Sequence, residues 1–218
     1  MADFDTIQME TGNNPDAAVI WLHGLGANSN DFVPVVKQLH LPENLSIRFI
    51  FPNAPTRPIT INQGMQMPGW YDISSLSIVD DEDEEGINAS STAIQALCET
   101  QEKRGISSNR IILAGFSQGG AIALHCGLGY QQQLGGIMAL SSYLPRCSPL
   151  EGSKNQNIPI FMAHGLDDEV VDPAYGKQSC QRLLDMGCGV AWHEYPMPHS
   201  VCMEEIQDIS VWLQDRLC

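Results

Sequence analysis

Short apolar runs alternate with segments of helical spacing along most of the chain. The runs have the length of strands and are bounded by Gly, Pro or Asp, which predicts strands that are buried on both faces. They cover residues 17–22, 47–51, 111–114, 135–141 and 158–165, and residues 190–195 alternate like one more strand. Helical spacing follows residue 32 and returns near 87–104, 118–128, 175–186 and 206–217. Strands separated by helices predict an α/β fold, with a mainly parallel sheet and helices on both faces.

Residues 52–79 interrupt this alternation. Prolines and glycines break regular structure here, yet the segment is unusually apolar for a solvated loop. Long ordered loops in compact domains are usually functional, so one hypothesis is that the segment forms a wall of a binding groove or a dimer contact. The alternative is a loop that folds onto the core and buries its apolar residues there.

The motif G-F-S-Q-G begins at Gly115, directly after the run at 111–114. It fits G-x-S-x-G and leads into a helical run of small residues, which predicts a nucleophile elbow at Ser117. The flanking glycines let strand and helix approach closely, while the serine is raised on a strained turn. The N–H of Gln118, at the helix N-terminus, points toward any negative charge that forms beside Ser117. The alternative is a glycine-rich turn whose serine only caps a helix.

Composition narrows the classes of function. The chain has 218 residues, enough for one domain over 1–218, and a formal net charge of -15, which argues against nucleic acid and against a stable membrane association. No apolar run reaches membrane-spanning length, and the acidic N-terminus does not resemble a secretory signal. Seven scattered cysteines without a C-x-x-C pair favour a cytoplasmic location over a disulfide framework or a zinc site. The acidic run at 80–85 favours a helix start over a calcium loop.

A serine nucleophile needs an imidazole base that a carboxylate orients, and in this fold class the chain order is Ser, then acid, then His. His199 lies in the loop between the last strand and the last helix, at the sheet edge where ligands bind. His193, inside the alternating strand, is the alternative. The acid candidates are Asp167, Asp168 and Asp172, in the loop after residues 158–165.

A tetrahedral oxyanion also needs hydrogen-bond donors. The N–H of Gln118 is one, and this fold supplies the second from an early strand-to-helix loop. His23-Gly24-Leu25-Gly26 is the glycine loop at that place, so the Leu25 N–H is the second candidate. His23, just before the loop turns, is expected to make a structural hydrogen bond.

Six motifs occur in a fixed order along the chain. They are H-G-L-G at His23, P-N-A-P at Pro52, G-W-Y-D at Gly69, G-F-S-Q-G-G at Gly115, H-G-x-x-D at His164 and P-M-x-H at Pro196. Together they resemble the small carboxylesterase and acyl-protein thioesterase family of α/β-hydrolases over nearly the whole chain. The resemblance implies an α/β-hydrolase fold without a separate cap domain, a catalytic triad of Ser117, Asp168 and His199, and no metal or organic cofactor.

The same resemblance implies a substrate class and an assembly. The segment H-G-L-D-D-E-V-V-D-P looks most like the bacterial carboxylesterase branch, whose members are commonly dimeric, so a homodimer is expected. Small-molecule esters with short to medium acyl chains are the expected substrates, with acyl thioesters or lysophospholipids as further ones. Trp70, Leu76 and Val171 are expected to line the acyl site. A catalytically silent binding module on the same scaffold is the alternative from another class.

Overall fold

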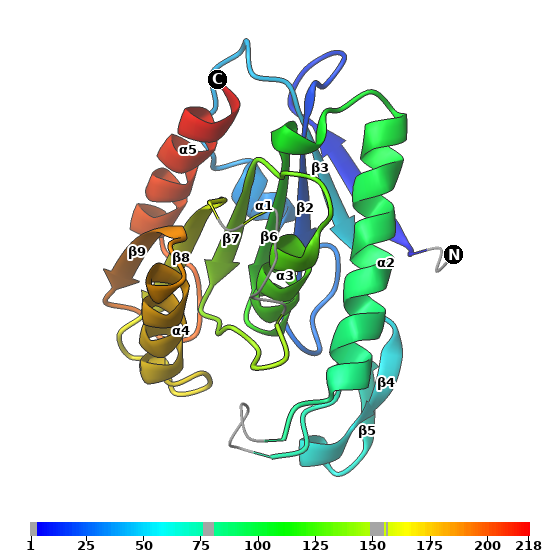
Figure 1. Ribbon diagram of the computed structural model, residues 1–218, viewed down its shortest axis with the longest axis vertical. Coiled ribbons are helices and arrows are strands. Elements are labelled where there is room, and N and C mark those ends of the chain that lie inside the picture. Colours follow the sequence, from blue (N-terminus) through cyan, green and yellow to red (C-terminus); the bar gives the residue numbers. More distant parts are fainter. Residues whose placement is uncertain (1–3, 76–80, 149–154, 156) are drawn as a thin grey trace.

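A seven-stranded sheet runs through the centre of the computed structural model, which describes residues 4–75, 81–148, 155 and 157–218 (Figure 1). The strand order is β1-β3-β2-β6-β7-β8-β9. The strands are β1 (Thr6–Glu10), β2 (Ala17–Leu22), β3 (Ile47–Pro52), β6 (Ile111–Phe116), β7 (Gly136–Leu140), β8 (Pro159–Gly165) and β9 (Gly189–Tyr195). β1 pairs antiparallel with β3, and the other neighbours in this order pair in parallel. The predicted mainly parallel α/β architecture is confirmed.

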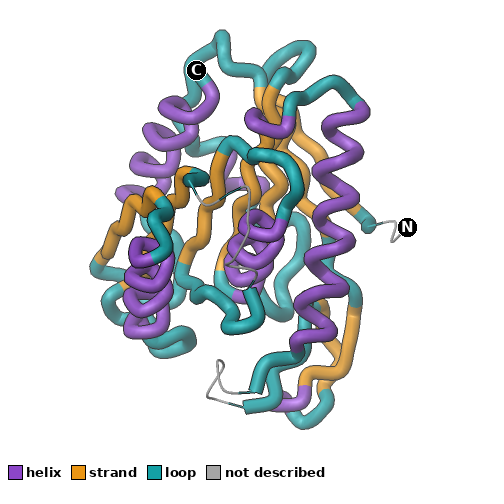
Figure 2. The backbone as a smooth tube through the Cα atoms, in the orientation of Figure 1, coloured by secondary structure: helices purple, strands orange, loops and turns teal. Residues whose placement is uncertain are grey.

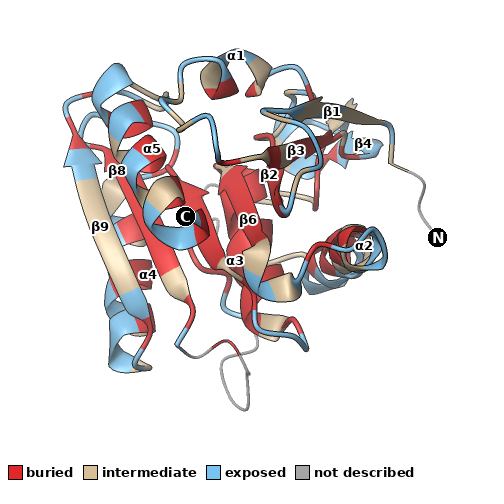
Figure 3. Ribbon diagram, turned by 90° about the horizontal axis from the view of Figure 1, so that it is seen from above, coloured by how far each residue is buried: buried red, intermediate tan, exposed pale blue. Residues whose placement is uncertain are grey.

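Helices cover both faces of this sheet. In the view of Figure 3, α2, α3 and α4 lie on one face, and α1 and α5 lie on the other. The helices are α1 (Val33–Val36), α2 (Glu84–Lys103), α3 (Gln118–Gly129), α4 (Pro173–Asp185) and α5 (Met203–Leu217). Within the described ranges, no helix combines the length and the apolar character that crossing a membrane would require.

The sheet separates two hydrophobic cores, and β2 shows how the sequence builds both. Ile20 and Leu22 belong to the core beneath α2, α3 and α4, whereas Val19 and Trp21 belong to the core beneath α1 and α5. Successive side chains of a strand point to opposite faces, so a strand covered on both sides must be apolar at every position. All of β2 is buried accordingly, which is the physical reason for the continuous apolar run at 17–22.

The parallel strands end at one edge of the sheet, where their following loops meet. The register pairs Leu22 at the end of β2 with Gly115 in β6, and Gly165 at the end of β8 with Tyr195 at the end of β9. The H-G-L-G loop, Ser117, the acid loop after β8 and the histidine loop after β9 therefore leave the sheet on the same side. This is the edge at which parallel sheets bind ligands.

Residues 52–75 fold partly as a hairpin and partly onto the core. β4 (Thr56–Ile59) pairs antiparallel with β5 (Met65–Pro68), and Figure 2 shows this hairpin beside the N-terminal end of α2. Ile59, Trp70 and Tyr71 are buried. For these three residues the structure supports the alternative of core packing. Leu76 lies outside the described residues.

The acidic run before α2 acts as a helix start. Asp83 is the N-cap, its side chain accepts a 2.9 Å hydrogen bond from the Gly86 N–H, and Glu84 and Glu85 occupy the first turn. Negative charge at this end offsets the positive end of the helix dipole and satisfies an amide that has no partner within the helix. The predicted helix start is confirmed for these residues.

Glu205, in the first turn of α5, is a fully buried carboxyl group. Its side chain is 0% exposed, and neither carboxylate oxygen has a hydrogen-bond partner of normal geometry among the described residues. Burial raises the pKa of Glu205 to about 8, although the nearby Cys202 amide at the helix N-cap opposes the shift. The folded protein therefore holds a proton that the unfolded chain releases near the ordinary glutamate pKa of 4.5. Stability that is present below that pH is lost as the pH rises toward about 8.

Replacing Glu205 by Gln should raise the melting temperature in a pH-dependent way. The amide resembles the protonated acid, so it removes the proton linkage without changing the shape of the side chain. We expect a small difference from wild type at pH 5 and a gain of several degrees at pH 8, measured by thermal unfolding. Glu204→Gln, at the exposed neighbouring position, is the matched control. A difference between variant and wild type that stays constant between pH 5 and pH 8 would contradict the linkage.

Candidate active site

Ser117 sits on a strained turn between β6 and α3. Its backbone has φ 54° and ψ -121°, a left-handed region that side chains rarely adopt. The turn is held by the Ser117 N–H, which donates to Leu140 O at 2.8 Å, and by the Ser117 carbonyl, which accepts from Ser142 Oγ at 2.7 Å and Gly120 N at 3.0 Å. These bonds oppose the strain and keep the hydroxyl-bearing residue at the sheet edge.

The flanking glycines let α3 approach the sheet. A Cβ atom at Gly115 would lie 2.2 Å from Gly119 O, and one at Gly119 would lie 2.5 Å from Leu22 O. Both values are far below contact distance, and both involve backbone atoms that cannot swing away. The motif G-x-S-x-G is thus a packing requirement as well as a chemical signature.

Asp168 and His199 meet on the loops that follow β8 and β9. His199 Nδ1 lies 2.7 Å from Asp168 Oδ2. A carboxylate oxygen is an acceptor, so Nδ1 carries the proton and Nε2 is left as a base. Asp168 Oδ1 accepts from the Val170 and Val171 amides, both at 2.9 Å, and its side chain is fully buried. The acid is therefore fixed by the backbone of its own loop.

Backbone hydrogen bonds join the loop that carries Asp168 to the loop that carries His199. The Asp167 N–H donates to Met197 O at 3.1 Å, and the Leu166 N–H donates to Tyr195 O at 2.8 Å. A Cβ at Gly165 would lie 2.3 Å from Met197 O, so this glycine permits the contact. The backbone thus sets the spacing between the acid and the imidazole.

The His199 ring packs against the elbow. Its centroid is 4.6 Å from that of Phe116, the residue before Ser117. The Ser117 hydroxyl and the His199 ring form no hydrogen bond in this structure, in which both residues are described. Catalytic hydrogen bonds are commonly long or misaligned without substrate and tighten in the complex. The structure therefore joins the acid to the imidazole and brings the imidazole beside the elbow.

His164 is a second imidazole on Asp168 that sequence reasoning missed. Its Nε2 lies 2.9 Å from Val171 O and 3.3 Å from Asp168 Oδ2. Both neighbours are acceptors, so Nε2 carries the proton, and burial lowers the pKa of His164 and keeps the ring neutral. The sequence signal for this contact is the motif H-G-x-x-D, which places His164 four residues before Asp168.

Two backbone amides near Ser117 have no hydrogen-bond partner among the described residues. Neither the Leu25 N–H nor the Gln118 N–H donates to an acceptor within the described part of the chain. A Cβ at Gly24 would lie 3.5 Å from Ser117 Cβ, so the Gly24-Leu25 backbone borders the nucleophile. Unpartnered amides at this place suit an oxyanion.

The other candidates for the acid and the base make different contacts. Asp172 is the N-cap of α4 and accepts from the Ala174 N–H at 2.8 Å. His193 stacks on Phe161 and lies 3.4 Å from Asp208. Asp167 is exposed and contributes its backbone to the loop. Of the three candidate acids, Asp168 is the one that contacts His199.

Trp70, which was expected to line the acyl site, is fully buried in this structure. Its side chain is 0% exposed, and its Nε1 donates to His23 O at 2.8 Å. An indole N–H in the core needs an acceptor, and the H-G-L-G loop supplies one. Val171 is 5% exposed and packs in the core near Asp168. Apolar side chains that are exposed near the acid are instead Leu166 and Val170.

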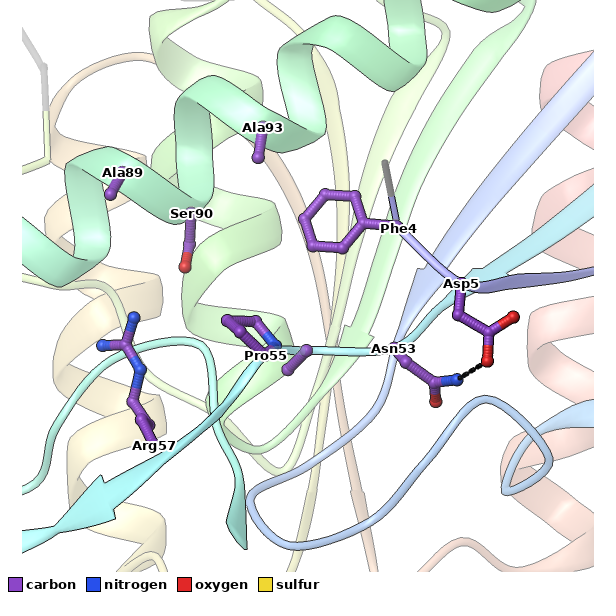
Figure 4. Close-up of a pocket in the computed structure, with 9 residues that line it drawn as sticks. Phe4, Asp5, Asn53, Pro55, Arg57, Ala89, Ser90 and Ala93 are labelled. Atoms are coloured by element: carbon purple, nitrogen blue, oxygen red, sulfur yellow. Dashed lines mark hydrogen bonds between the residues drawn. The ribbon is translucent and has the colours of Figure 1, made fainter. Parts of the chain in front are cut away.

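A pocket of about 450 Å³ opens away from these residues, between α2 and the segment after β3 (Figure 4). Its lining consists of Phe4, Asp5, Asn53, Ala54, Pro55, Arg57, Ala89, Ser90 and Ala93. It contains none of the catalytic candidates, so its size alone does not make it the active site. Across the described residues, no group of three or more His, Cys, Asp or Glu side chains is arranged to hold a metal ion.

Comparison with known proteins finds relatives in sequence and in structure. A family model described as phospholipase/carboxylesterase matches residues 6–217. The acyl-protein thioesterase 1 of Neurospora crassa is 41% identical over 92% of this chain and 87% of the relative, and that of Yarrowia lipolytica is 38% identical over 92% of each. The crystal structure of Zea mays acyl-protein thioesterase 2 gives a TM-score of 0.86 at 28% identity, covering 98% of this chain and 99% of that chain. The similarity in sequence and in fold extends over nearly the whole chain.

Gly119→Ala should destabilise the elbow. The new methyl group would press on the backbone carbonyls of β2, so α3 would have to move away from the sheet. We expect a melting temperature lower by several degrees or more, because overpacking against backbone costs about 1–3 kcal/mol or more. Gly189→Ala, where nothing lies within 4 Å of the added atom, is the control. Equal melting temperatures for the two variants would show that the elbow tolerates a Cβ.

Asp168→Asn should abolish most activity while the neighbouring Asp167→Asn should not. The oxygen of the substituted amide would still accept from the two loop N–H groups, so its NH₂ group would face His199 and force Nδ1 to become an acceptor. The proton would then sit on Nε2, and no base would face the serine. We expect kcat for a p-nitrophenyl ester to fall on the order of 10⁴-fold. Similar losses in both variants would remove the distinction between the two carboxylates.

Proposed function

The chain belongs to the phospholipase/carboxylesterase family and is a hydrolase, and we propose that it is a carboxylesterase that works through an acyl-enzyme on Ser117. The observation that carries the proposal is the 2.7 Å contact between His199 Nδ1 and Asp168 Oδ2, beside a strained serine elbow. An orienting carboxylate, an imidazole and a raised hydroxyl are the three groups that acyl transfer to water needs.

In the first half of the reaction, Nε2 of His199 takes the proton of Ser117 as the hydroxyl oxygen attacks the substrate carbonyl. Asp168 keeps the imidazole in the tautomer that leaves Nε2 free, and it stabilises the imidazolium that forms. The amides of Leu25 and Gln118 donate to the oxyanion of the tetrahedral intermediate. Collapse of this intermediate expels the alcohol, which takes the proton from His199.

In the second half, water attacks the acyl-enzyme. His199 removes a proton from the water, a second tetrahedral intermediate forms at the same two amides, and the carboxylic acid leaves as Ser117 regains its proton. The same groups act in both halves, so one oxyanion hole and one base are sufficient.

The substrates that fit best are esters with short to medium acyl chains. Leu166 is 51% exposed and Val170 is 68% exposed, both on the loop that carries Asp168, and they offer apolar surface beside the site. Acyl thioesters are the second candidate, favoured by the names of the Neurospora crassa and Yarrowia lipolytica relatives. Both substrates give the same acyl-enzyme and differ in the leaving group.

Ser117→Ala tests the nucleophile. We expect kcat for p-nitrophenyl esters to fall about 10⁴–10⁶-fold, with loss of labelling by a fluorophosphonate. Ser107→Ala, at an exposed position, is the control and should keep wild-type activity and labelling. Near-wild-type hydrolysis by the Ser117 variant would refute the proposal, and a folded wild-type protein that is neither labelled nor active would support a silent binding module.

A matched substrate panel separates the two substrate classes. Oxygen esters and thioesters of the same acyl groups, together with lysophospholipids, are compared by kcat/KM with identification of the products. A carboxylesterase prefers the oxygen esters of short to medium chains. Consistently higher kcat/KM for long-chain thioesters would favour the thioesterase alternative.

A further inference from the structure

His23 is buried directly beneath the candidate oxyanion loop, and both of its ring nitrogens are engaged. The side chain is 2% exposed. Its Nε2 lies 3.0 Å from the Ala54 N–H nitrogen, and its Nδ1 lies 2.7 Å from Gly24 O. The catalytic steps proposed above do not use this imidazole.

The neighbours of His23 fix its protonation state. The Ala54 amide can only donate, so Nε2 accepts and carries no hydrogen. The Gly24 carbonyl can only accept, so Nδ1 carries the proton and donates. Burial lowers the pKa of His23 and keeps the ring neutral. A neutral ring with the proton on Nδ1 is the state that satisfies both contacts.

The planar peptide connects this hydrogen bond to the reaction site. Gly24 C=O and Leu25 N–H belong to one trans peptide unit, in which the two bonds point in opposite directions. The Gly24 carbonyl accepts from the His23 ring at 2.7 Å and from the Ala27 N–H at 3.2 Å, so the Leu25 N–H is turned to the opposite side, where it has no acceptor in the described chain. The Gly24 backbone borders Ser117, because a Cβ atom added at Gly24 would lie 3.5 Å from Ser117 Cβ.

We propose that His23 is a positioning residue: by holding the Gly24 carbonyl, its Nδ1–H aims the Leu25 amide at the oxyanion. This inference rests on the proposed function, because it requires the Leu25 amide to be an oxyanion donor.

A second set of buried hydrogen bonds, made by Trp70 and Gln118, stabilises the backbone at His23 and at Gln118. Trp70 Nε1 donates to His23 O at 2.8 Å, and the Trp70 N–H donates to Gln118 Oε1 at 2.9 Å. Gln118 Nε2 in turn donates to Tyr71 O at 2.8 Å. The side chain of Gln118 thus ties its own helix start to the segment that holds His23. The two proposed oxyanion donors, the Leu25 and Gln118 amides, are therefore both anchored by hydrogen bonds to the buried segment at Trp70 and Tyr71.

Two residues that line the pocket of Figure 4 contact Trp70. Phe4 and Ser90 line the pocket there, the ring of Phe4 packs edge-on against Trp70 with centroids 5.9 Å apart, and Ser90 Oγ donates to Trp70 O. Ala54, whose amide binds His23, lines the same pocket. The pocket thus borders the residues that contact His23 and Trp70, and the loop is held in addition by the Ala27 N–H, which donates to Gly24 O at 3.2 Å, and by the Gly26 N–H, which donates to Pro68 O at 2.8 Å.

Two substitutions separate positioning from ordinary core packing. In His23→Asn, the side-chain NH₂ falls near the place of Nδ1 and can still donate to Gly24 O, while the contact to Ala54 is lost. In His23→Gln, the side-chain oxygen reaches the place of Nε2 and can still accept from Ala54, while the donor to Gly24 is lost. Each variant keeps one bond and loses the other, so each carries a comparable cost in stability.

We expect His23→Gln to lower kcat for a p-nitrophenyl ester about 10–10³-fold with little change in KM, as loss of an aimed oxyanion donor does. His23→Asn should retain kcat within about 3-fold of wild type, since a bond lost far from the reacting atoms leaves transition-state binding in place. Affinity for a boronic acid that mimics the tetrahedral intermediate should fall in parallel with kcat. Equal losses of kcat in the two variants, or losses that follow only their melting temperatures, would overturn the inference.

The tautomer can also be read in the wild-type protein, independent of whether the variants fold. ¹⁵N NMR of histidine-labelled protein, assigned to His23 through the Ala54 amide, should show a protonated Nδ1 and an unprotonated Nε2. A protonated Nε2 would overturn the inference. Loss of all Ser117-dependent hydrolysis in the wild type would instead overturn the proposed function, whereas activity with the wrong tautomer would overturn the inference alone.

Discussion

The close approach of α3 to the sheet is the constraint on which the site depends. The helix begins immediately after a residue with positive φ, and the glycines on either side leave room for carbonyl groups of β2 and of the helix itself. This contact brings Ser117, the free Gln118 amide and the H-G-L-G loop to one point at the sheet edge. A helix displaced by the width of a methyl group would separate Ser117 from the Leu25 amide, the proposed oxyanion donor, even with every proposed catalytic side chain present.

The acid is stabilised by a different means, since it is fully buried. A carboxylate removed from water is costly unless donors replace the water. Asp168 receives two backbone amides on Oδ1 and two imidazole nitrogens near Oδ2. The backbone donors hold the carboxylate in place, which leaves Oδ2 to orient His199. Burial is an advantage in the proposed mechanism, because a desolvated carboxylate interacts more strongly with the imidazolium that this mechanism forms.

The sequence predicts most of the sheet and the elbow, because those features are local. Continuous apolar runs predict β2, β3, β6, β7 and β8, and G-x-S-x-G with its flanking pattern predicts the turn at Ser117. β1 has no comparable signal, since T-I-Q-M-E is only partly buried and becomes a strand by pairing with β3. α1 is shorter than its apolar spacing predicts, and its β-branched valines have low helix propensity. The burial of Trp70 depends on an acceptor from the His23 carbonyl, far away in the sequence, which no local pattern reveals.

Because His164 is neutral, the charge of Asp168 remains available for His199. His164 Nε2 lies 3.3 Å from Asp168 Oδ2, and burial lowers the pKa of His164, as it does for His23. A charged His164 would neutralise Asp168 before the proposed reaction starts and would repel the positive charge that this mechanism places on His199. Held neutral, it supplies a hydrogen bond without competing for that charge. In the proposed mechanism, the interaction between Asp168 and His199 therefore strengthens as the proton leaves Ser117, which is when a catalyst must bind most tightly.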